Sequence, residues 1–150
     1  MSAADAIGRT YPKLPPYEVG REKIREFAEA IGDRNPAYLD AAAAQKLGHP
    51  DVIAPPTFPI IFTMRSTGAA VLDPELGIDY SRVVHGEQRF VYQRPVHAGD
   101  RLVCETTVED LKNRAGSIFL YMRTDVTTED GEQVLAAYSV IVSRAPEKES

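Results

Sequence analysis

The chain has 150 residues, of which 43% are hydrophobic and 26% are charged, so one globular domain spanning residues 1–150 can bury a core. A formal net charge of −5 argues against a nucleic-acid surface, which needs a basic patch, and the single cysteine, Cys104, excludes an internal disulfide. No apolar run approaches the roughly 18 residues of a membrane span, and the first residues lack a signal-peptide core. We therefore expect a cytoplasmic protein without nucleic-acid or membrane partners, and a disordered tail at residues 145–150.

The N-terminal third is predicted to form an extended arm followed by two helices. Residues 9–20 contain three prolines, which favour extended backbone. Residues 21–32 have the apolar spacing of an amphipathic helix that ends at Gly32. The spaced apolar residues are Ile24, Phe27, Ala28 and Ile31. Residues 40–48 follow as a short helix, with Asp40 as its N-cap and Gly48 as its stop.

Residues 57–72 form a different kind of helix, because Arg65 is the one charged residue among sixteen. A helix that is apolar on nearly every side is expected to be buried on nearly every side. Thr57 can cap this helix, and Pro59 is tolerated in its first turn. The Arg65 guanidinium must form an ion pair, lie at an end of the helix, or reach water by extending its side chain. In a chain this short, the best cover for such a helix is a sheet wrapped around it.

The second half of the chain supplies that sheet. Four runs, at 86–96, 102–111, 117–127 and 133–142, contain strand-forming residues, and turn segments such as Asp130–Gly131 separate them. Three of the runs alternate with a period of two, which indicates an antiparallel sheet covered on one face. The predicted covered faces are Leu102, Cys104, Thr106 and Val108; Ile118, Leu120, Met122 and Val126; and Val134, Ala136, Tyr138, Val140 and Val142. The fold class is therefore α+β.

Three segments carry a resemblance to a known family. FAEAIGDRNPAYLDAAAA (27–44), APPTF (54–58) and HGEQRFVYQRPVHAGDRL (85–102) resemble, in this order, the MaoC-like (R)-specific enoyl-thioester hydratases and dehydratases, in their N-terminal dehydratase-type branch. The resemblance implies the hot-dog fold, an antiparallel sheet wrapped around a long buried helix. It also implies reversible hydration of a trans-2-enoyl thioester of CoA or acyl carrier protein (ACP), which needs no cofactor.

The family's hydratase motif reads Gly-Asp-x-Asn-Pro-x-His, and its Asp and His handle the water. Asp33 matches the Asp and Asn35 the Asn, but Tyr38 stands at the His position. A tyrosine, whose reference pKa is about 10, is a poor base at neutral pH. The chain thus most resembles the non-catalytic subunit of a heterodimeric (R)-3-hydroxyacyl-ACP dehydratase. The resemblance makes Asp33 a candidate catalytic residue, and Asn35 and Tyr38 candidate substrate-binding residues. From residue types alone, Asp33 and Asn35 would simply form a turn, and Tyr38 would fill the space of the missing imidazole.

Two alternatives remain open. In the first, a self-sufficient homodimer uses Asp33 and His85, since the position of His85 recurs in the resembled branch and can face a thioester. In the second, the chain binds acyl-CoA or acyl-ACP without catalysis. In each case Gly86, Thr57 and Phe58 are candidates to offer backbone N–H groups to the thioester carbonyl, near the start of the buried helix.

The remaining candidate residues point to no other site. The histidines His49, His85 and His97 lack metal-ligand spacing, so no metal is expected. His49 is expected in a loop and His97 in a solvent-facing turn. Cys104 falls on the apolar side of its strand, where a buried, inert thiol is expected.

Overall fold

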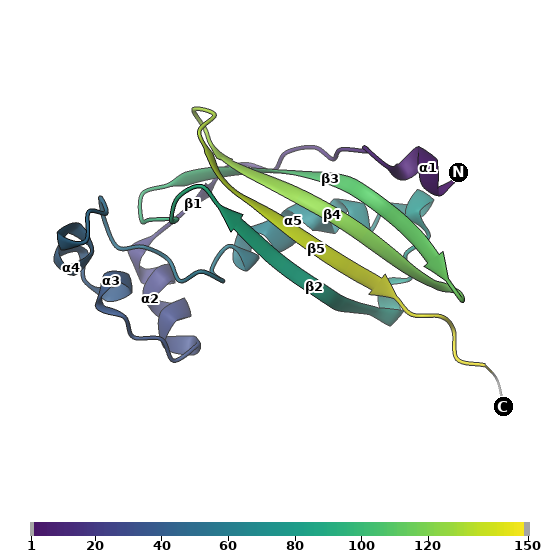
Figure 1. Ribbon diagram of the computed structural model, residues 1–150, viewed down its shortest axis with the longest axis horizontal. Coiled ribbons are helices and arrows are strands. Elements are labelled where there is room, and N and C mark those ends of the chain that lie inside the picture. Colours follow the sequence, from purple (N-terminus) through teal and green to yellow (C-terminus); the bar gives the residue numbers. More distant parts are fainter. Residues whose placement is uncertain (1, 149–150) are drawn as a thin grey trace.

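The computed structural model describes residues 2–148 and shows a five-stranded antiparallel sheet curled around helix α5 (Figure 1). The strand order is β1-β3-β4-β5-β2. In chain order the elements are α1 Ala3–Ala6, β1 Tyr17–Glu18, α2 Arg21–Ala30, α3 Pro36–Leu39, α4 Ala41–Lys46, α5 Ile60–Val71, η1 Pro74–Leu76, η2 Tyr80–Arg82, β2 Val83–Tyr92, β3 Arg101–Arg114, β4 Ser117–Thr128 and β5 Gln133–Ser143. The α+β hot-dog arrangement predicted from the sequence is confirmed. Of the predicted disordered tail, residues 145–148 have no regular secondary structure and residues 149–150 lie outside the described part.

Helix α5 is shorter and less enclosed than the sequence predicted. It starts at Ile60 with Pro59 as N-cap, so the prediction that Thr57 caps it was wrong. A turn precedes it, in which the Phe58 N–H donates to the Pro55 carbonyl over 2.9 Å. One side of α5 packs on the sheet, but Met64 on the other side is 55% exposed. A single sheet covers a helix on one side, so burial on nearly every side is not achieved within this chain.

The two short helical predictions are confirmed in place. The Asp40 carboxylate accepts the Ala42 N–H over 2.9 Å and caps α4, and Gly32 ends α2 with a φ of 72° that favours glycine. Ile31 was predicted to share the buried face of α2 but is 48% exposed. It is the C-cap residue, beyond the last helical turn, so the helical spacing no longer controls its direction.

The covered face of the sheet was predicted correctly for two strands and wrongly for one. The predicted faces of β3 and β4 are buried, apart from the half-buried Ile118 at the start of β4. On β5 Val134 is buried as predicted, but beyond it the alternate face is buried, through Leu135, Ala137, Ser139 and Ile141. Both faces of β5 are rich in apolar residues, so its period of two could not identify the inner one.

A chain of buried hydroxyls, Ser66–Thr106 at 2.7 Å and Thr106–Thr124 at 2.9 Å, joins α5 to β3 and β4.

The two edges of the sheet differ. The β3 edge is covered by β1 at residues 101–102 and by the N-terminal arm farther along, where Gly8 and Arg9 exchange backbone hydrogen bonds with Val108 and the Tyr11 N–H donates to Thr106. Strand β2 forms the other edge and pairs with β5 alone among the described residues. None of the helices in residues 2–148 is long and apolar enough to cross a bilayer.

Candidate functional site

The loop between α2 and α3 contains the Asp and Asn of the motif in two successive local turns. Asp33 Oδ1 accepts the Asn35 N–H over 3.3 Å, and Asn35 Oδ1 accepts the Ala37 N–H over 3.0 Å. Asn35 is thus the N-cap of α3, and Pro36 occupies the first helical position, where it loses no hydrogen bond. These bonds fix the short helix that directs Tyr38 inward. Both Asp33 and Asn35 are exposed.

Tyr38 is the buried residue of the motif and lines an apolar pocket of about 330 Å³. Its side chain leaves the residue only 8% exposed. Burial, and secondarily the negative charge of Asp33, raises the pKa of the Tyr38 phenol. At neutral pH the phenol is therefore protonated and acts as a hydrogen-bond donor rather than as a base. The pocket is lined by Tyr38, Ile53, Ala54, Pro56, Tyr92, Gln93, Arg94 and Pro95.

Tyr92 is a second tyrosine in this pocket, and it was not predicted from the sequence. Its hydroxyl donates to the Pro56 carbonyl over 2.7 Å and so ties the end of β2 to the turn before α5. Burial, with a smaller contribution from Tyr38, raises the Tyr92 pKa well above its usual range. An aromatic residue at the end of a strand was the only signal in the sequence, and that signal fits a core residue equally well.

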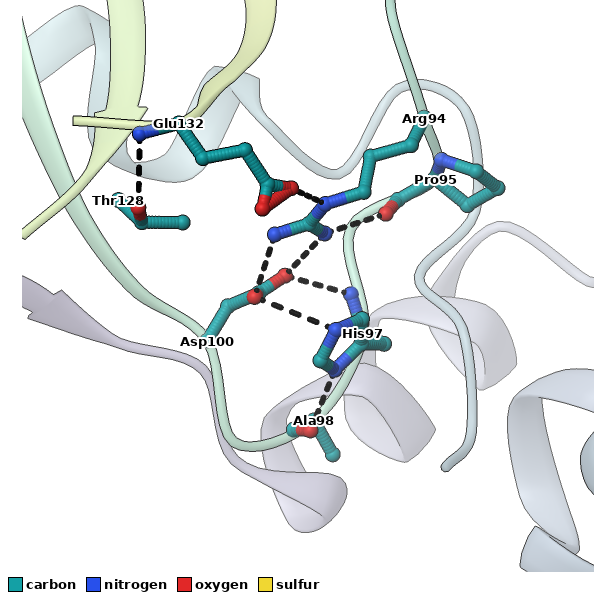
Figure 2. Close-up of polar contacts among 7 residues, drawn as sticks. All are labelled: Arg94, Pro95, His97, Ala98, Asp100, Thr128 and Glu132. Atoms are coloured by element: carbon teal, nitrogen blue, oxygen red, sulfur yellow. Dashed lines mark hydrogen bonds and ion pairs between the residues drawn. The ribbon is translucent and has the colours of Figure 1, made fainter. Parts of the chain in front are cut away.

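Arg94 lies in the pocket wall and is held by carboxylates behind it (Figure 2). Its guanidinium makes two 2.9 Å hydrogen bonds to Asp100, whose side chain is 5% exposed, and a third to Glu132. These hydrogen bonds raise the Arg94 pKa. Because both carboxylates neutralise it, Arg94 stabilises the wall of the pocket rather than offering a free charge to a ligand.

His97 belongs to the same cluster (Figure 2), and the prediction that it faces solvent was wrong. Its side chain is 23% exposed, with Nδ1 2.8 Å from the Ala98 carbonyl and Nε2 3.3 Å from Asp100 Oδ1. Its backbone N–H also donates to Asp100 over 3.0 Å. Because both the backbone N–H and the imidazole of His97 contact Asp100, the ring is held against this buried carboxylate and away from solvent. His49 lies in a loop, as predicted.

His85 and Gly86 lie elsewhere, near the start of β2. His85 lines a cavity of about 20 Å³ beneath α5, which shares no lining residue with the Tyr38 pocket. The helices α2 and α3 lie beyond the opposite end of β2 (Figure 1). Within one chain the structure therefore does not bring Asp33 and His85 together. Gly86 lies at a β-bulge, where a Cβ would approach the Val140 carbonyl to 3.3 Å, so the close approach of β5 favours glycine.

The two residues at the start of the buried helix have different surroundings. Thr57 is exposed in the turn beside Pro56, next to the pocket. Phe58 is fully buried and packs edge-on against Phe27, with ring centroids 5.5 Å apart. Because its N–H already donates to Pro55, Phe58 contributes to the core and has no N–H to offer a thioester carbonyl.

Two further predictions concern reactive groups. Cys104 is buried, as expected, and burial raises the pKa of its thiol to about 12, which makes it unreactive at neutral pH. Across residues 2–148, no three His, Cys, Asp or Glu side chains come together as the ligands of a metal ion would.

Comparisons with known proteins agree with this geometry. The family model for the FAS1-like dehydratase domain region matches residues 5–137. A UPF0336 protein of Streptomyces coelicolor is 58% identical over 142 residues, 95% of either chain. A solved MaoC-like dehydratase matches 96% of this chain with a TM-score of 0.87 and 30% identity. That protein is longer, and the match covers 44% of its length. A chain of the HadBC (3R-hydroxyacyl-ACP dehydratase) complex of Mycobacterium tuberculosis matches with a TM-score of 0.79 and 33% identity. The match covers 94% of this chain and 99% of that one. The chain therefore belongs to the FAS1-like dehydratase family and has the MaoC-like hot-dog fold.

Proposed function

We propose that this chain is the acyl-thioester-binding subunit of an (R)-3-hydroxyacyl-thioester dehydratase, which interconverts the hydroxyacyl and trans-2-enoyl thioesters. Tyr38 is the observation that carries the proposal. It stands at the histidine position of the resembled motif, and burial and Asp33 raise its pKa, so it is protonated at neutral pH. A protonated phenol cannot accept the proton that a hydratase base must remove. The substrate is an acyl-CoA or acyl-ACP.

The pocket beside Tyr38 supports binding rather than catalysis. Its volume of about 330 Å³ lies at the lower end of small-molecule sites, and none of its eight lining residues is a carboxylate or a histidine. Arg94 is neutralised by Asp100 and Glu132, and the Tyr92 hydroxyl is engaged by Pro56. Tyr38 and the exposed Gln93 are thus the lining side chains that can donate a hydrogen bond to a thioester carbonyl, and Tyr38 is the buried one of the two.

The missing base is expected on a second hot-dog chain. The similarity to a chain of the HadBC dehydratase complex supports this arrangement. The open edge of β2 supports it as well, because an unpaired strand edge invites another strand. A partner with the intact Asp–His pair would supply the chemistry, and this chain the acyl pocket.

We expect the chain to be dimeric, with itself or with that partner, at micromolar concentration. Light scattering coupled to size exclusion measures this directly. A proline at Gln88 should weaken the dimer, while a proline at Lys13, in the exposed N-terminal arm, should not. Because the Gln93 N–H donates to β5 and successive N–H groups of a strand alternate in direction, the Gln88 N–H faces the open edge. A wild-type mass near 16.5 kDa across that concentration range would contradict the expectation.

The direct test is an enoyl-thioester hydration assay with and without the partner. A hot-dog chain with the intact motif, co-expressed with this one, should co-purify with it and hydrate crotonyl-CoA. This chain alone should bind the thioester, as measured by calorimetry, but turn it over at a rate lower by about 10² or more. If adding the partner changes neither binding nor rate, the subunit assignment fails and a purely binding role is favoured.

A second candidate is the self-sufficient homodimer that uses His85. The Nε2 atom of His85 lies 3.0 Å from the Glu87 carbonyl, which can only accept a hydrogen bond, so in the neutral ring the proton lies on Nε2 and Nδ1 is the basic atom. Thr63, Thr124 and Ser139 give polar character to the small cavity that His85 lines. In this candidate Asp33 would have to come from the other protomer, because one chain keeps the two residues apart.

A further inference from the structure

Arg65 lies on α5 with no acidic partner. Among residues 2–148 no carboxylate lies within ion-pair distance of its guanidinium, which instead stacks over the Tyr17 ring at 5.7 Å. It is the one charge in residues 57–72, a segment otherwise made of apolar and small polar residues. A lone guanidinium retains its donors, and its planar fork matches a carboxylate in geometry.

Beside Arg65 lies a groove of about 290 Å³ with apolar walls. The N-terminal arm forms one wall at residues 14–17, and Phe62 of α5 forms another. The floor is made by Leu102 and Cys104 of β3, which are 1% and 6% exposed. Arg65 is the only charged residue in this lining, and the groove shares no residue with the Tyr38 pocket.

We propose that this groove is a second binding site, for a carboxylate on an unbranched alkyl chain of medium length. The apolar walls require a hydrocarbon body, and one unpaired cation calls for one singly charged head. A phosphate head, whose charge is close to two, would need more than the single cation present. The volume suits a short chain rather than a nucleotide or a polycyclic ligand.

The position of the groove adds a structural consequence. Its wall is the arm that crosses β3, and Tyr17 also packs against Phe62, with ring centroids 5.1 Å apart. A ligand seated there contacts both the arm and α5.

The test compares octanoate with 1-octanol, which has the same chain length without the charge. Calorimetry on the intact protein should show octanoate binding at least about fivefold more tightly than 1-octanol. Arg65→Gln should weaken octanoate binding about fivefold and leave octanol binding unchanged, because it removes one partly exposed charge pair. Arg114→Gln is the matched control: Arg114 also stacks on a ring, Phe119, at 5.4 Å, but lies in the β3–β4 hairpin away from the groove. It should bind both ligands as the wild type does.

Location is read from the groove wall. Leu14 lines the groove and is 44% exposed, so Leu14→Ala should weaken the binding of both octanoate and 1-octanol and leave the binding of crotonyl-CoA unchanged. The site is disproved if Arg65→Gln binds octanoate as tightly as the wild type, if 1-octanol binds as tightly as octanoate, or if Leu14→Ala binds octanoate as tightly as the wild type. Because the groove and the Tyr38 pocket share no residues, each of these results leaves the proposed function standing.

Discussion

Tyr38→His should raise the rate of enoyl-thioester hydration by the isolated chain at least about tenfold, the lower part of what one acid–base group supplies. The substitution restores an imidazole, with a reference pKa of about 6.5, at the position where a buried phenol is now protonated. Asp33 already influences the charge state of this position, as its contribution to the Tyr38 pKa shows. The measurement is loss of the enoyl-thioester absorbance with crotonyl-CoA, at equal protein concentration.

Two controls separate catalysis from a change of pocket shape. Tyr38→Phe removes the hydroxyl and keeps the ring, so it should give no gain. Asp33→Asn in the Tyr38→His background should remove most of the gain, because the pair acts together. If the Tyr38→His protein is folded and binds the thioester but its hydration rate equals that of the wild type, Asp33 is not placed for catalysis.

The wild-type rate decides between this proposal and the His85 candidate. Turnover by the chain alone at ordinary enzyme rates, about 1–10³ s⁻¹, would favour His85 as the base. In that event His85→Ala should abolish turnover while thioester binding persists. A slow wild type whose rate is unaffected by His85→Ala supports the role of Tyr38.

Asp100→Ala should lower the free energy of unfolding by about 3 kcal/mol, the size of effect seen when one member of a buried ion pair is removed. The Asp100 side chain is 5% exposed and accepts two hydrogen bonds from Arg94 and one from the His97 backbone. Its loss leaves a largely buried guanidinium with one carboxylate, Glu132, in place of two. Urea unfolding at fixed protein concentration measures the change.

Glu132→Ala is the matched comparison for that prediction. It removes the other carboxylate from the same guanidinium, but the Glu132 side chain is 54% exposed. Water compensates an exposed charge, so we expect a loss below about 1 kcal/mol. Equal effects of the two substitutions would show that burial does not control the strength of the Arg94 contacts.

The fold was largely predictable because its strongest signals are local. The nearly uncharged segment that became α5, the Asp40 cap and the glycine stops each follow from residues close in sequence. Two errors have a common origin in non-local packing. The inner face of β5 is chosen by contact with α5 and its neighbouring strands, and the exposure of Met64 follows from how far the sheet reaches around the helix.

The site was only partly predictable for the same reason. The motif brought Asp33, Asn35 and Tyr38 together because they are neighbours in the chain. Tyr92 and Arg94 join them only through folding, when the end of β2 meets the turn before α5. The separation of Asp33 from His85 was also not predictable from the sequence. It arises because His85 lies near the start of β2, whereas the helices that flank Asp33 lie beyond the other end of that strand.

The unequal edges of the sheet also limit how the chain can assemble. One long edge is blocked by β1 and the N-terminal arm, so residues 2–148 offer a single strand, β2, for lateral addition. A protomer with one open strand edge can form a closed dimer but not a linear polymer, because the dimer has no further open strand. The arm therefore prevents the growth of fibres by covering the β3 edge. A truncated chain that lacks residues 2–16 would have open strand edges at both β2 and β3 and would be able to polymerise.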